Sequence, residues 1–524
     1  MSVRSLRCVF HRSQRSWRCV VLLGVILGAL PTVALRAQHT SNVRAVVLVG
    51  SDRDDVLRFG SSRDSIGAPS WLVVSRRSAQ LNPQHGSRRS FAALLPHVGI
   101  SAVSAIPAPL EAGGQLAARG VNASFTAGGQ ARLAGLSVQL LPQLFVSQNR
   151  PVAWTTWRDP RDGASPWRFP FVIDRSSIDL PLRFGEEVGR VATWGQSYAA
   201  VAGRLGEVGI SHEVRWWGPG RRNALMLGNH HEGFPHAYLQ TERVLRGASR
   251  VRLELLSGRL RESRYFDTTR ANDRRGIAAV QVAFSSGPEL AGFTTGVQRL
   301  VVRAQNADPR DAFRRTAGNE AQQAAGVFAR YATAGGASEA WMEWLRFSEP
   351  AGLRDLLVYP GRTQAYTMGF AWRPADRTRI ELEHTNSEPD ASSRRERTTP
   401  SYAGIEVPQG FTQAGRPLGS AIGPGSSSQW IALDHDRRDG TRLGVNLQRV
   451  RWHNAHRTDP RLTTIAREDV SLIAGARADR LRLWSTQVGV SYGIERRLNY
   501  LFASTAARDR LNHVLRFQLT ADRP

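Results

Sequence analysis

One run of the sequence, residues 215–236, holds the residue types that bind sugars. Two adjacent tryptophans are followed by a Gly-Pro-Gly turn, two arginines and two asparagines. Indole rings stack on the apolar faces of sugars, guanidinium groups pair with carboxylates and amides bond to hydroxyls, so this set suits an acidic polysaccharide. The candidate polysaccharide-binding residues are Trp216, Trp217, Arg221, Arg222, Asn223 and Asn229. The alternative for the two tryptophans is an aromatic pair at the membrane interface beside a structural turn.

Patterns for catalysis and metal binding are missing from the sequence. It has no Walker loop, no dinucleotide-binding glycine pattern, no nucleophile elbow and no HExxH motif. His212 is followed by Trp216 where a second histidine is required. The adjacent His230 and His231 point to opposite sides of an extended chain, which makes a shared metal ion sterically awkward. We therefore predict no enzyme activity, no metal and no cofactor.

The charge of the chain limits its partners. All 70 residues counted as Lys+Arg are arginine, against 44 Asp+Glu, and the formal net charge is +26. A charge of this size raises nucleic acid as a partner. The arginines are spread between strand-like segments, however, without a basic helix or a dense cluster among aromatics. We therefore predict contact with anionic polymer, lipopolysaccharide or counterions, and no nucleic acid.

The first 37 residues have the anatomy of an export signal. Five arginines between residues 4 and 18 form a cationic segment, residues 20–30 form an apolar segment too short to span a bilayer, and Ala37 offers a cleavage site. Both cysteines, Cys8 and Cys19, lie here, so removing 37 of the 524 residues leaves 487 without a cysteine. The mature chain is predicted to be exported and free of disulfides.

From about residue 98 onward, apolar side chains alternate with small or polar ones in segments of roughly ten residues, which is typical of strands with one face toward lipid and one toward a lumen. In residues 366–372, large apolar side chains alternate with Thr367, Gly369 and Ala371. Tryptophans in or at the ends of such segments are expected in interface girdles. These are Trp341, Trp372, Trp430, Trp452 and Trp484. A soluble β-sandwich or propeller shares this alternation and is the alternative.

Short and long connections also alternate, as in outer-membrane barrels with short periplasmic turns and long external loops. Short turns are expected near Gly206, 246–248, 286–289, 334–337, 374–376, 437–440 and Ala478, and long loops at 216–234, 259–275, 305–324, 348–361, 387–427, 453–467 and 501–509. With both termini in the periplasm, the strand number must be even. Reading 480–500 as one strand, and counting back through 197–205, 130–146, 115–126 and a weak first strand at 98–106, gives eighteen strands.

The predicted fold class is therefore all-β: a transmembrane antiparallel β-barrel of about eighteen strands over residues 98–524. Residues 38–97 do not fit the strand pattern. Ser51 with three following aspartates predicts a helix start, Gly60 predicts its end, and residues 70–78 predict a second short helix. We expect a linker with short periplasmic helices or a lumen plug there, and a disordered leader is the alternative.

The run from Trp216 to Pro235 resembles a known family. WWGPG followed by N-x-L-x-L-x-N and GFP, preceded by IDLPLRFG at 178–185 and GQSY at 195–198, is similar to the Wzi capsule-assembly family of outer-membrane proteins. The likeness covers about residues 178–240, and Asp55-Val56-Leu57-Arg58 adds to it. The resemblance implies an eighteen-stranded barrel with a periplasmic helical bundle, acting as a lectin that holds capsular polysaccharide at the cell surface.

Two features depart from that pattern. The family usually has Asn-Ala where this chain has His230-His231, and barrels commonly finish on an aromatic residue for the assembly machinery, whereas Phe517 is followed here by residues 518–524. The expected function is a non-enzymatic lectin for capsular or extracellular polysaccharide in the bacterial outer membrane. Its expected partners besides the polysaccharide are outer-membrane lipid, lipopolysaccharide and the barrel assembly machinery. A diffusion channel is the alternative, followed by an outer-membrane enzyme that acts on lipid or glycan.

Overall fold

A computed structural model describes residues 43–44, 48, 89–110, 113–152, 167–169, 176–245, 249–286, 292–304, 306–314, 321–333, 336–390, 399–455, 468–502 and 509–521. The predicted export signal at 1–37 and the predicted helices near 51–60 and 70–78 lie outside these residues.

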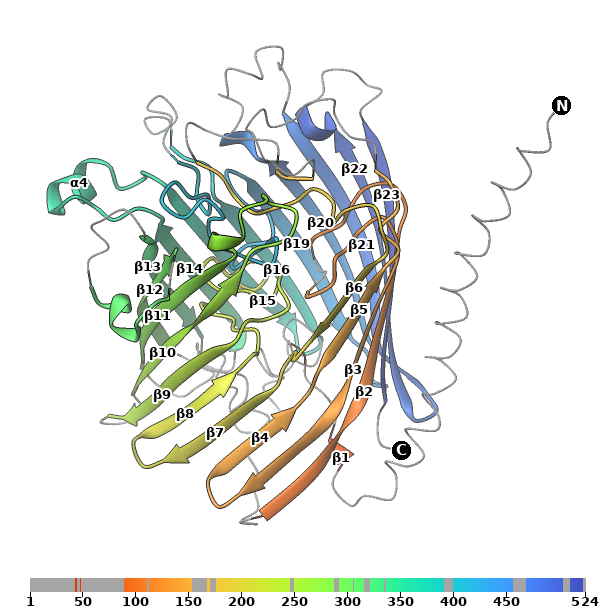
Figure 1. The fold of residues 1–524 in the computed structure, drawn as a ribbon. Coiled ribbons are helices and arrows are strands. Elements are labelled where there is room, and N and C mark those ends of the chain that lie inside the picture. Colours follow the sequence, from red (N-terminus) through yellow and green to blue (C-terminus); the bar gives the residue numbers. More distant parts are fainter. Residues whose placement is uncertain are drawn as a thin grey trace.

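The described chain forms a closed antiparallel β-barrel of eighteen strand positions (Figure 1). The barrel strands are β2 (Arg89–Val103), β3 (Gly120–Leu133), β4 (Leu136–Leu140), β5 (Gln143–Ser147), β6 (Gly189–Thr193), β7 (Tyr198–Gly203), β8 (Gly206–Ser211), β9 (His236–Val244), β10 (Arg250–Arg261), β11 (Arg274–Ser285), β12 (Gly292–Arg303), β13 (Ala321–Ala332), β14 (Ser338–Arg346), β15 (Gln364–Ala375), β16 (Thr378–Asn386), β19 (Ser427–Asp436), β20 (Arg442–Trp452), β21 (Asp469–Leu483), β22 (Thr486–Leu498) and β23 (Arg510–Ala521). Two positions consist of two short strands each, β4 with β5 and β6 with β7.

Closure joins the first and last strands of this barrel. β23 pairs with β2, with Phe517 opposite Ile100, and β1 (Val43–Arg44) adds a short parallel pairing to β2. A barrel without an open edge satisfies its backbone hydrogen bonds internally, as lipid requires. The predicted all-β barrel and its strand number are confirmed.

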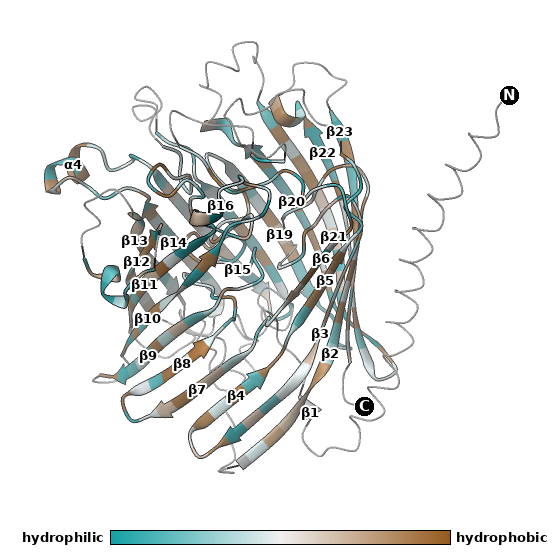
Figure 2. Ribbon diagram, viewed as in Figure 1, coloured by the Kyte–Doolittle hydropathy of each residue, from teal (hydrophilic) through white to brown (hydrophobic). Residues whose placement is uncertain are grey.

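The side chains divide by strand parity, as predicted. On β15, Thr367 is fully buried toward the lumen, whereas Met368, Phe370 and Trp372 are 43–49% exposed on the outer face. Figure 2 shows apolar and hydrophilic residues mixed along the strands, which is the pattern of a wall with two different faces. Large apolar side chains exposed all around a closed barrel face lipid.

The connections also follow the prediction, with short turns at one end of the barrel and long loops at the other (Figure 1). Three boundaries differ. β2 begins at Arg89, before the predicted residue 98. The predicted strand 130–146 is divided by a two-residue turn in which Ala134 and Gly135 both have positive φ, as a tight hairpin requires. The last short turn joins Leu483 to Thr486, so its predicted position at Ala478 is wrong.

Three of the five tryptophans predicted for the interface girdles lie on the lumen side instead. Trp341 is 3% exposed, and Trp430 and Trp452 line a cavity inside the barrel. Trp372 and Trp484 are exposed, at 46% and 92%. The girdle prediction rested on the position of each tryptophan along its segment. Side chains alternate between the two faces of a strand, so the face depends on whether a residue is an odd or an even number of positions from an outward residue such as Met342.

Helical elements in the described chain are short. They are η1 (Arg270–Asn272), η2 (Pro309–Ala312), α4 (Leu353–Val358) and η6 (Tyr500–Phe502). No helix in this part of the chain has the length and apolar run needed to cross a membrane.

The lumen is filled by connections from the long-loop end. Residues 212–235, the plug loop, pack against residues 399–426, the cap loop, which contains β17 (Thr412–Gln413) and β18 (Arg416–Pro417). Residues 176–188 pair with the cap loop in turn, through two hydrogen bonds of 2.8 Å between Ser177 and Gly404. The largest apolar cluster combines these loops with inward wall residues.

Candidate functional site

The plug loop starts and ends at the extracellular ends of β8 and β9 but folds into the lumen. Its backbone doubles back on itself, because the amide of Trp217 donates to the carbonyl of Leu227 at 3.0 Å. Gly228 then donates to Leu418 of the cap loop at 2.7 Å. The prediction of an external loop is correct for the end of the barrel at which residues 212–235 connect the strands. It is wrong for the fold of the loop, which turns into the lumen because acidic residues of the inner wall bind its backbone.

The Gly-Pro-Gly turn lets the plug loop approach Glu343 on β14. Gly218 has φ +102°, and a Cβ at this position would lie 2.2 Å from Glu343 Oε1. The amides of Gly220 and Leu225 donate to the two oxygens of this carboxylate at 2.7 and 3.1 Å. Successive backbone N–H groups in a turn form an anion-binding concavity. Here the acceptor is a carboxyl group of the barrel itself.

Glu383 on β16 is bound in the same way, by the residues between Gly220 and Leu225. The amides of Arg221, Arg222 and Asn223 donate to its carboxylate at 2.7 to 3.1 Å. The indole of Trp341 adds a fourth donor at 3.3 Å. The plug loop therefore forms two adjacent backbone cradles that fasten it to β14 and β16.

The two candidate tryptophans have different environments. Trp217 is fully buried, and its Nε1–H donates to Glu254 of β10 at 3.2 Å. Arg215 forms an ion pair with the same carboxylate at 3.2 Å. Trp216 is half-buried, donates to the carbonyl of Gly220 at 3.0 Å and lines the lumen cavity described below. Trp217 is therefore a core residue of the plug loop, whereas Trp216 faces the lumen cavity.

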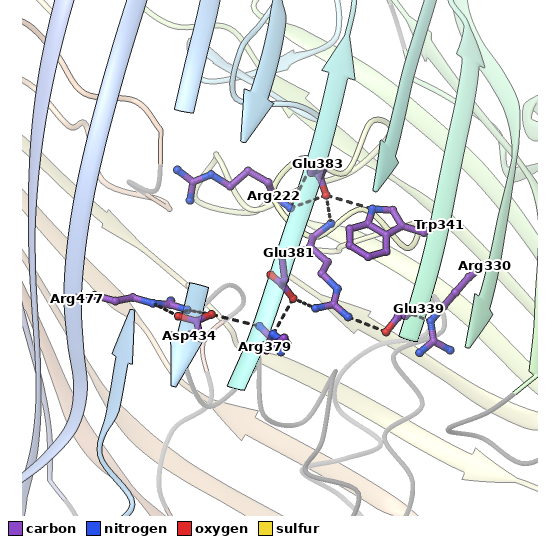
Figure 3. A network of polar contacts seen from close by, with 10 residues as sticks. Arg222, Arg330, Glu339, Trp341, Arg379, Glu381, Glu383, Asp434 and Arg477 are labelled. Atoms are coloured by element: carbon purple, nitrogen blue, oxygen red, sulfur yellow. Dashed lines mark hydrogen bonds and ion pairs between the residues drawn. The ribbon is translucent and has the colours of Figure 1, made fainter. Parts of the chain in front are cut away.

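Arg221 links the plug loop to a ladder of alternating charges that crosses the inner wall (Figure 3). Its guanidinium pairs with Glu381 and, at 2.7 Å, with Glu339, and lies 4.8 Å from the centroid of Trp341. The whole ladder runs Arg477, Asp434, Arg379, Glu381, Arg221, Glu339, Arg330, from β21 to β13. Because the Arg221 guanidinium is buried and has a carboxylate of the protein on each side, its charge stabilises the fold and is not available to pair with a ligand.

The remaining candidates are Asn223, Arg222 and Asn229, which differ in burial and in their hydrogen bonds within the protein. Asn223 is 2% exposed, and its side chain bonds to Thr385 and Ser420 at 3.3 and 2.9 Å. Arg222 donates to Gln448 at 3.1 Å while also lining the lumen cavity. Asn229 is half-buried and lines the same cavity. The structure thus brings all six candidates together. All of them except Trp217 line the lumen cavity, and of these Trp216, Arg222 and Asn229 are the half-buried ones.

Two neighbouring cavities lie between the plug loop and the wall. The lumen cavity, of about 240 Å³, is bounded by the plug loop and by β19 to β23, and Gly475, Gly489 and Gly493 leave room along that wall. The outer cavity, of about 140 Å³, lies among the extracellular loops around Arg183 and Arg416. The two share lining residues, which are Pro107, Pro109, His230, Ala421 and Trp452.

The adjacent histidines point to different spaces. His230 lines the lumen and outer cavities, whereas His231 lines a separate side cavity of about 130 Å³ near β2 and β3. His231 Nδ1 accepts a hydrogen bond from the amide of Gly233 at 3.0 Å. Burial, together with neighbouring basic groups, lowers the pKa of both imidazoles to about 3, so both are neutral. No group of three potential metal ligands occurs among the described residues.

Sequence reasoning missed the carboxylates that hold the plug loop. Glu254, Glu343 and Glu383 lie on strands, at inward positions, and none was selected as a site residue. The sequence does contain a signal for these inward carboxylates. Glu339 and Glu343, and again Glu381 and Glu383, recur at even spacing opposite outward apolar residues, which marks a charged lumen wall.

Comparisons with known proteins give a likeness of fold. No protein-family model matches the sequence, and no curated protein sequence does. Among solved structures, Wzi of Escherichia coli, described as an outer-membrane protein involved in group 1 capsule assembly and a carbohydrate-binding β-barrel, matches with a TM-score of 0.57. The identity is 12%, over 91% of this chain and 99% of that chain. OccAB2 of Acinetobacter baumannii and OprD of Pseudomonas aeruginosa match with TM-scores of 0.40, at 10% and 8% identity, over 82% and 83% of this chain and 97% and 93% of theirs.

A closed eighteen-stranded antiparallel barrel with an apolar outer face is the architecture of bacterial outer-membrane proteins. The protein is located in that membrane.

Proposed function

We propose that this outer-membrane barrel is a non-enzymatic lectin-like protein that attaches or organises an acidic capsular or extracellular polysaccharide at the cell surface. The observation that carries the proposal is the filled lumen. Plug and cap loops pack there as an apolar core that includes Trp217, Leu225, Phe234 and Phe411, all at most 2% exposed. A barrel filled in this way presents a fixed extracellular surface instead of a wide aqueous pore.

The charge of the extracellular surface supports an acidic ligand. Exposed arginines lie on three long loops that follow one another around the rim, between β10 and β15. They are Arg264, Arg270, Arg310, Arg314 and Arg354. Exposed guanidinium groups bind polymeric carboxylates through many weak, salt-sensitive contacts. The similarity of fold to a barrel described as carbohydrate-binding agrees with this assignment.

Polymer binding can be tested on the folded protein in lipid nanodiscs, with alginate as acidic polysaccharide and dextran as neutral control. We expect alginate to bind and dextran to bind far more weakly. A rim variant, with glutamine at Arg264, Arg270, Arg310 and Arg314, should lose on the order of tenfold in affinity at low salt, since each exposed pair contributes a few tenths of a kcal/mol.

A matched control removes the same charge at the opposite end of the barrel. Glutamine at Arg204, Arg377, Arg437 and Arg438, all exposed in short turns, should leave alginate binding unchanged. Absence of alginate binding, or an equal loss in both variants, contradicts a specific extracellular polymer site.

The second candidate function is a diffusion channel, and the row of neighbouring cavities favours it. The outer and lumen cavities share lining residues, the lumen cavity reaches Asp479 and Gly489 near a short turn, and the lumen and side cavities share Asn229, Arg516 and Gln518. Conductance in a planar bilayer separates the two functions. The lectin proposal expects a nearly silent barrel, whereas a steady conductance comparable to that of open porins favours the channel.

A further inference from the structure

His230 lies where the lumen and outer cavities meet, and its polar atoms are free. The side chain is 8% exposed, and neither Nδ1 nor Nε2 has a hydrogen-bond partner within the described structure. A buried polar group without a partner costs free energy, so such a group in a native fold calls for a ligand or ordered water. A neutral imidazole offers one donor and one acceptor, which is the complement of a sugar hydroxyl pair.

The surroundings of His230 carry positive charge. Arg222 and Arg416 are the charged groups that act on it most strongly, and Arg416 is 6% exposed. Arg416 makes a long hydrogen bond of 3.5 Å to the carbonyl of Gly113, and its nearby carboxylate, Glu232, is already paired with Arg261 at 2.5 Å. The described residues that line the outer cavity include four arginines and no carboxylate; Arg497 is paired with Asp469 at 2.7 Å, which leaves Arg119, Arg183 and Arg416. The carboxylates of the lumen cavity, Glu381, Asp479 and Glu495, do not line the outer cavity. An anionic group is therefore favoured at this point.

The lumen cavity adds surfaces suited to a sugar ring. Trp216, Trp430 and Trp452 line it, and Trp430 Nε1 is a second buried donor without a partner. Asn229 and Gln448 contribute amide groups to the same lining. Its volume of about 240 Å³ corresponds to several water molecules, at roughly 30 Å³ each in the liquid, and the outer cavity borders on it at His230.

We propose that the space around His230, where the lumen and outer cavities border on one another, is a buried binding site for one acidic sugar residue, a uronate, with His230 bonding ring hydroxyls and Arg222 and Arg416, one from each cavity, attracting the carboxylate. The site rests on the proposed function in that the uronate is the end of a bound polymer. This pocket recognises both the ring and the charge of the sugar, whereas the exposed arginines of the rim recognise charge alone.

Titration of the nanodisc-embedded protein with glucuronate, glucose and acetate tests the ligand class. Glucuronate should bind more tightly than glucose, which lacks the charge, and than acetate, which lacks the ring. His230→Phe keeps an aromatic ring but removes both polar atoms, and it should weaken glucuronate on the order of tenfold to a hundredfold. Equal binding of acetate and glucuronate would reduce the site to an anion pocket and overturn the sugar assignment.

A second variant blocks the cavity without altering its polar groups. A Cβ on Gly493 meets nothing closer than 3.9 Å, so Gly493→Leu should enter the lumen cavity and abolish glucuronate binding while the unheated protein keeps its gel mobility. Gly203→Leu, at the end of β7 beside a short turn and with open space around its Cβ, is the matched control and should bind normally. Unchanged glucuronate binding in both His230→Phe and Gly493→Leu overturns the site.

The alginate assay separates the two proposals. Alginate binding without glucuronate binding disproves the cavity site and leaves the lectin function standing. Glucuronate binding without alginate binding disproves the polymer function and leaves the cavity site standing.

Discussion

Trp217 shows how a residue type suited to sugar stacking is used for packing instead. Its indole is fully buried, its N–H is satisfied by Glu254, and the ring belongs to the apolar cluster that fills the lumen. Burying an indole and satisfying its N–H stabilises a core by several kcal/mol. Substitution of Trp217 therefore disturbs the plug itself, and loss of ligand binding in such a variant says little about direct contact.

Two acidic residues on the extracellular loops make a loop contact sensitive to pH. Asp179 accepts hydrogen bonds from the amide and hydroxyl of Ser263 at 2.7 and 2.5 Å, and burial raises its pKa from 3.8 to about 6. Burial also raises the pKa of the neighbouring Glu262 from 4.5 to about 7. A raised carboxyl pKa means that the folded contact binds more protons than the opened one.

The contact should therefore be most stable at low pH and lose stability as the pH rises from about 4 to about 7. Hydrogen-exchange protection of the Ser263 amide, corrected for the intrinsic rate at each pH, measures this. The double variant Asp179→Asn, Glu262→Gln stays neutral, so its protection should vary much less across this range. Protection that rises with pH in the unchanged protein contradicts the assignment.

The plug loop is held as an element by backbone cradles and by one side chain. Glu343 and Glu383 bind its amides, while Arg221 occupies the gap between Glu381 and Glu339 in the charge ladder. Removing one partner of a buried ion pair typically costs about 3–5 kcal/mol, because the remaining charge stays buried. The carboxylates of the ladder keep Arg379 and Arg330, which limits the damage to the plug loop.

Arg221→Ala should therefore loosen the plug loop without unfolding the wall. We expect faster proteolysis within residues 212–235 and brief conductance openings in a planar bilayer, at unchanged gel mobility of the unheated barrel. Arg437→Ala, which removes an exposed arginine in a short turn, serves as control. A stable, silent Arg221→Ala protein shows that the backbone cradles alone hold the plug.

At the scale of the whole molecule, the outer face of the barrel is apolar and suited to lipid, and the loops inside the barrel form an apolar core like that of a soluble protein. Outward positions carry large apolar side chains, inward positions carry carboxylates, amides and arginines, and the loops supply the apolar residues that fill the centre. The wall closes between β23 and β2 without covalent links, since the two cysteines lie in the predicted export signal. Hydrogen bonding along closed strands provides the rigidity.

The architecture followed from the sequence because its signals are local. Period-two alternation, as in residues 364–372, is set by the geometry of each strand, and the alternation of short and long connections counts the strands. Boundaries were less secure where small residues blur the alternation, as at Ala478 and around residues 127–135. The grouping of the six candidate residues was also local, since all lie within one loop.

The tertiary structure alone decided what that loop does. Its partners, Glu343 and Glu383, are separated from it by 118 to 162 residues in the chain, so no local pattern announces them. Glycines and arginines in a turn have the same spacing whether they face water or a buried carboxylate. The burial of Trp217, Arg221 and Asn223, and the position of His230 beside two cavities, follow from which distant strands lie opposite the loop. The plug loop lies inside the lumen because of contacts between residues that are far apart in the sequence. Those contacts are made by the closed barrel, and no local segment of the chain contains them.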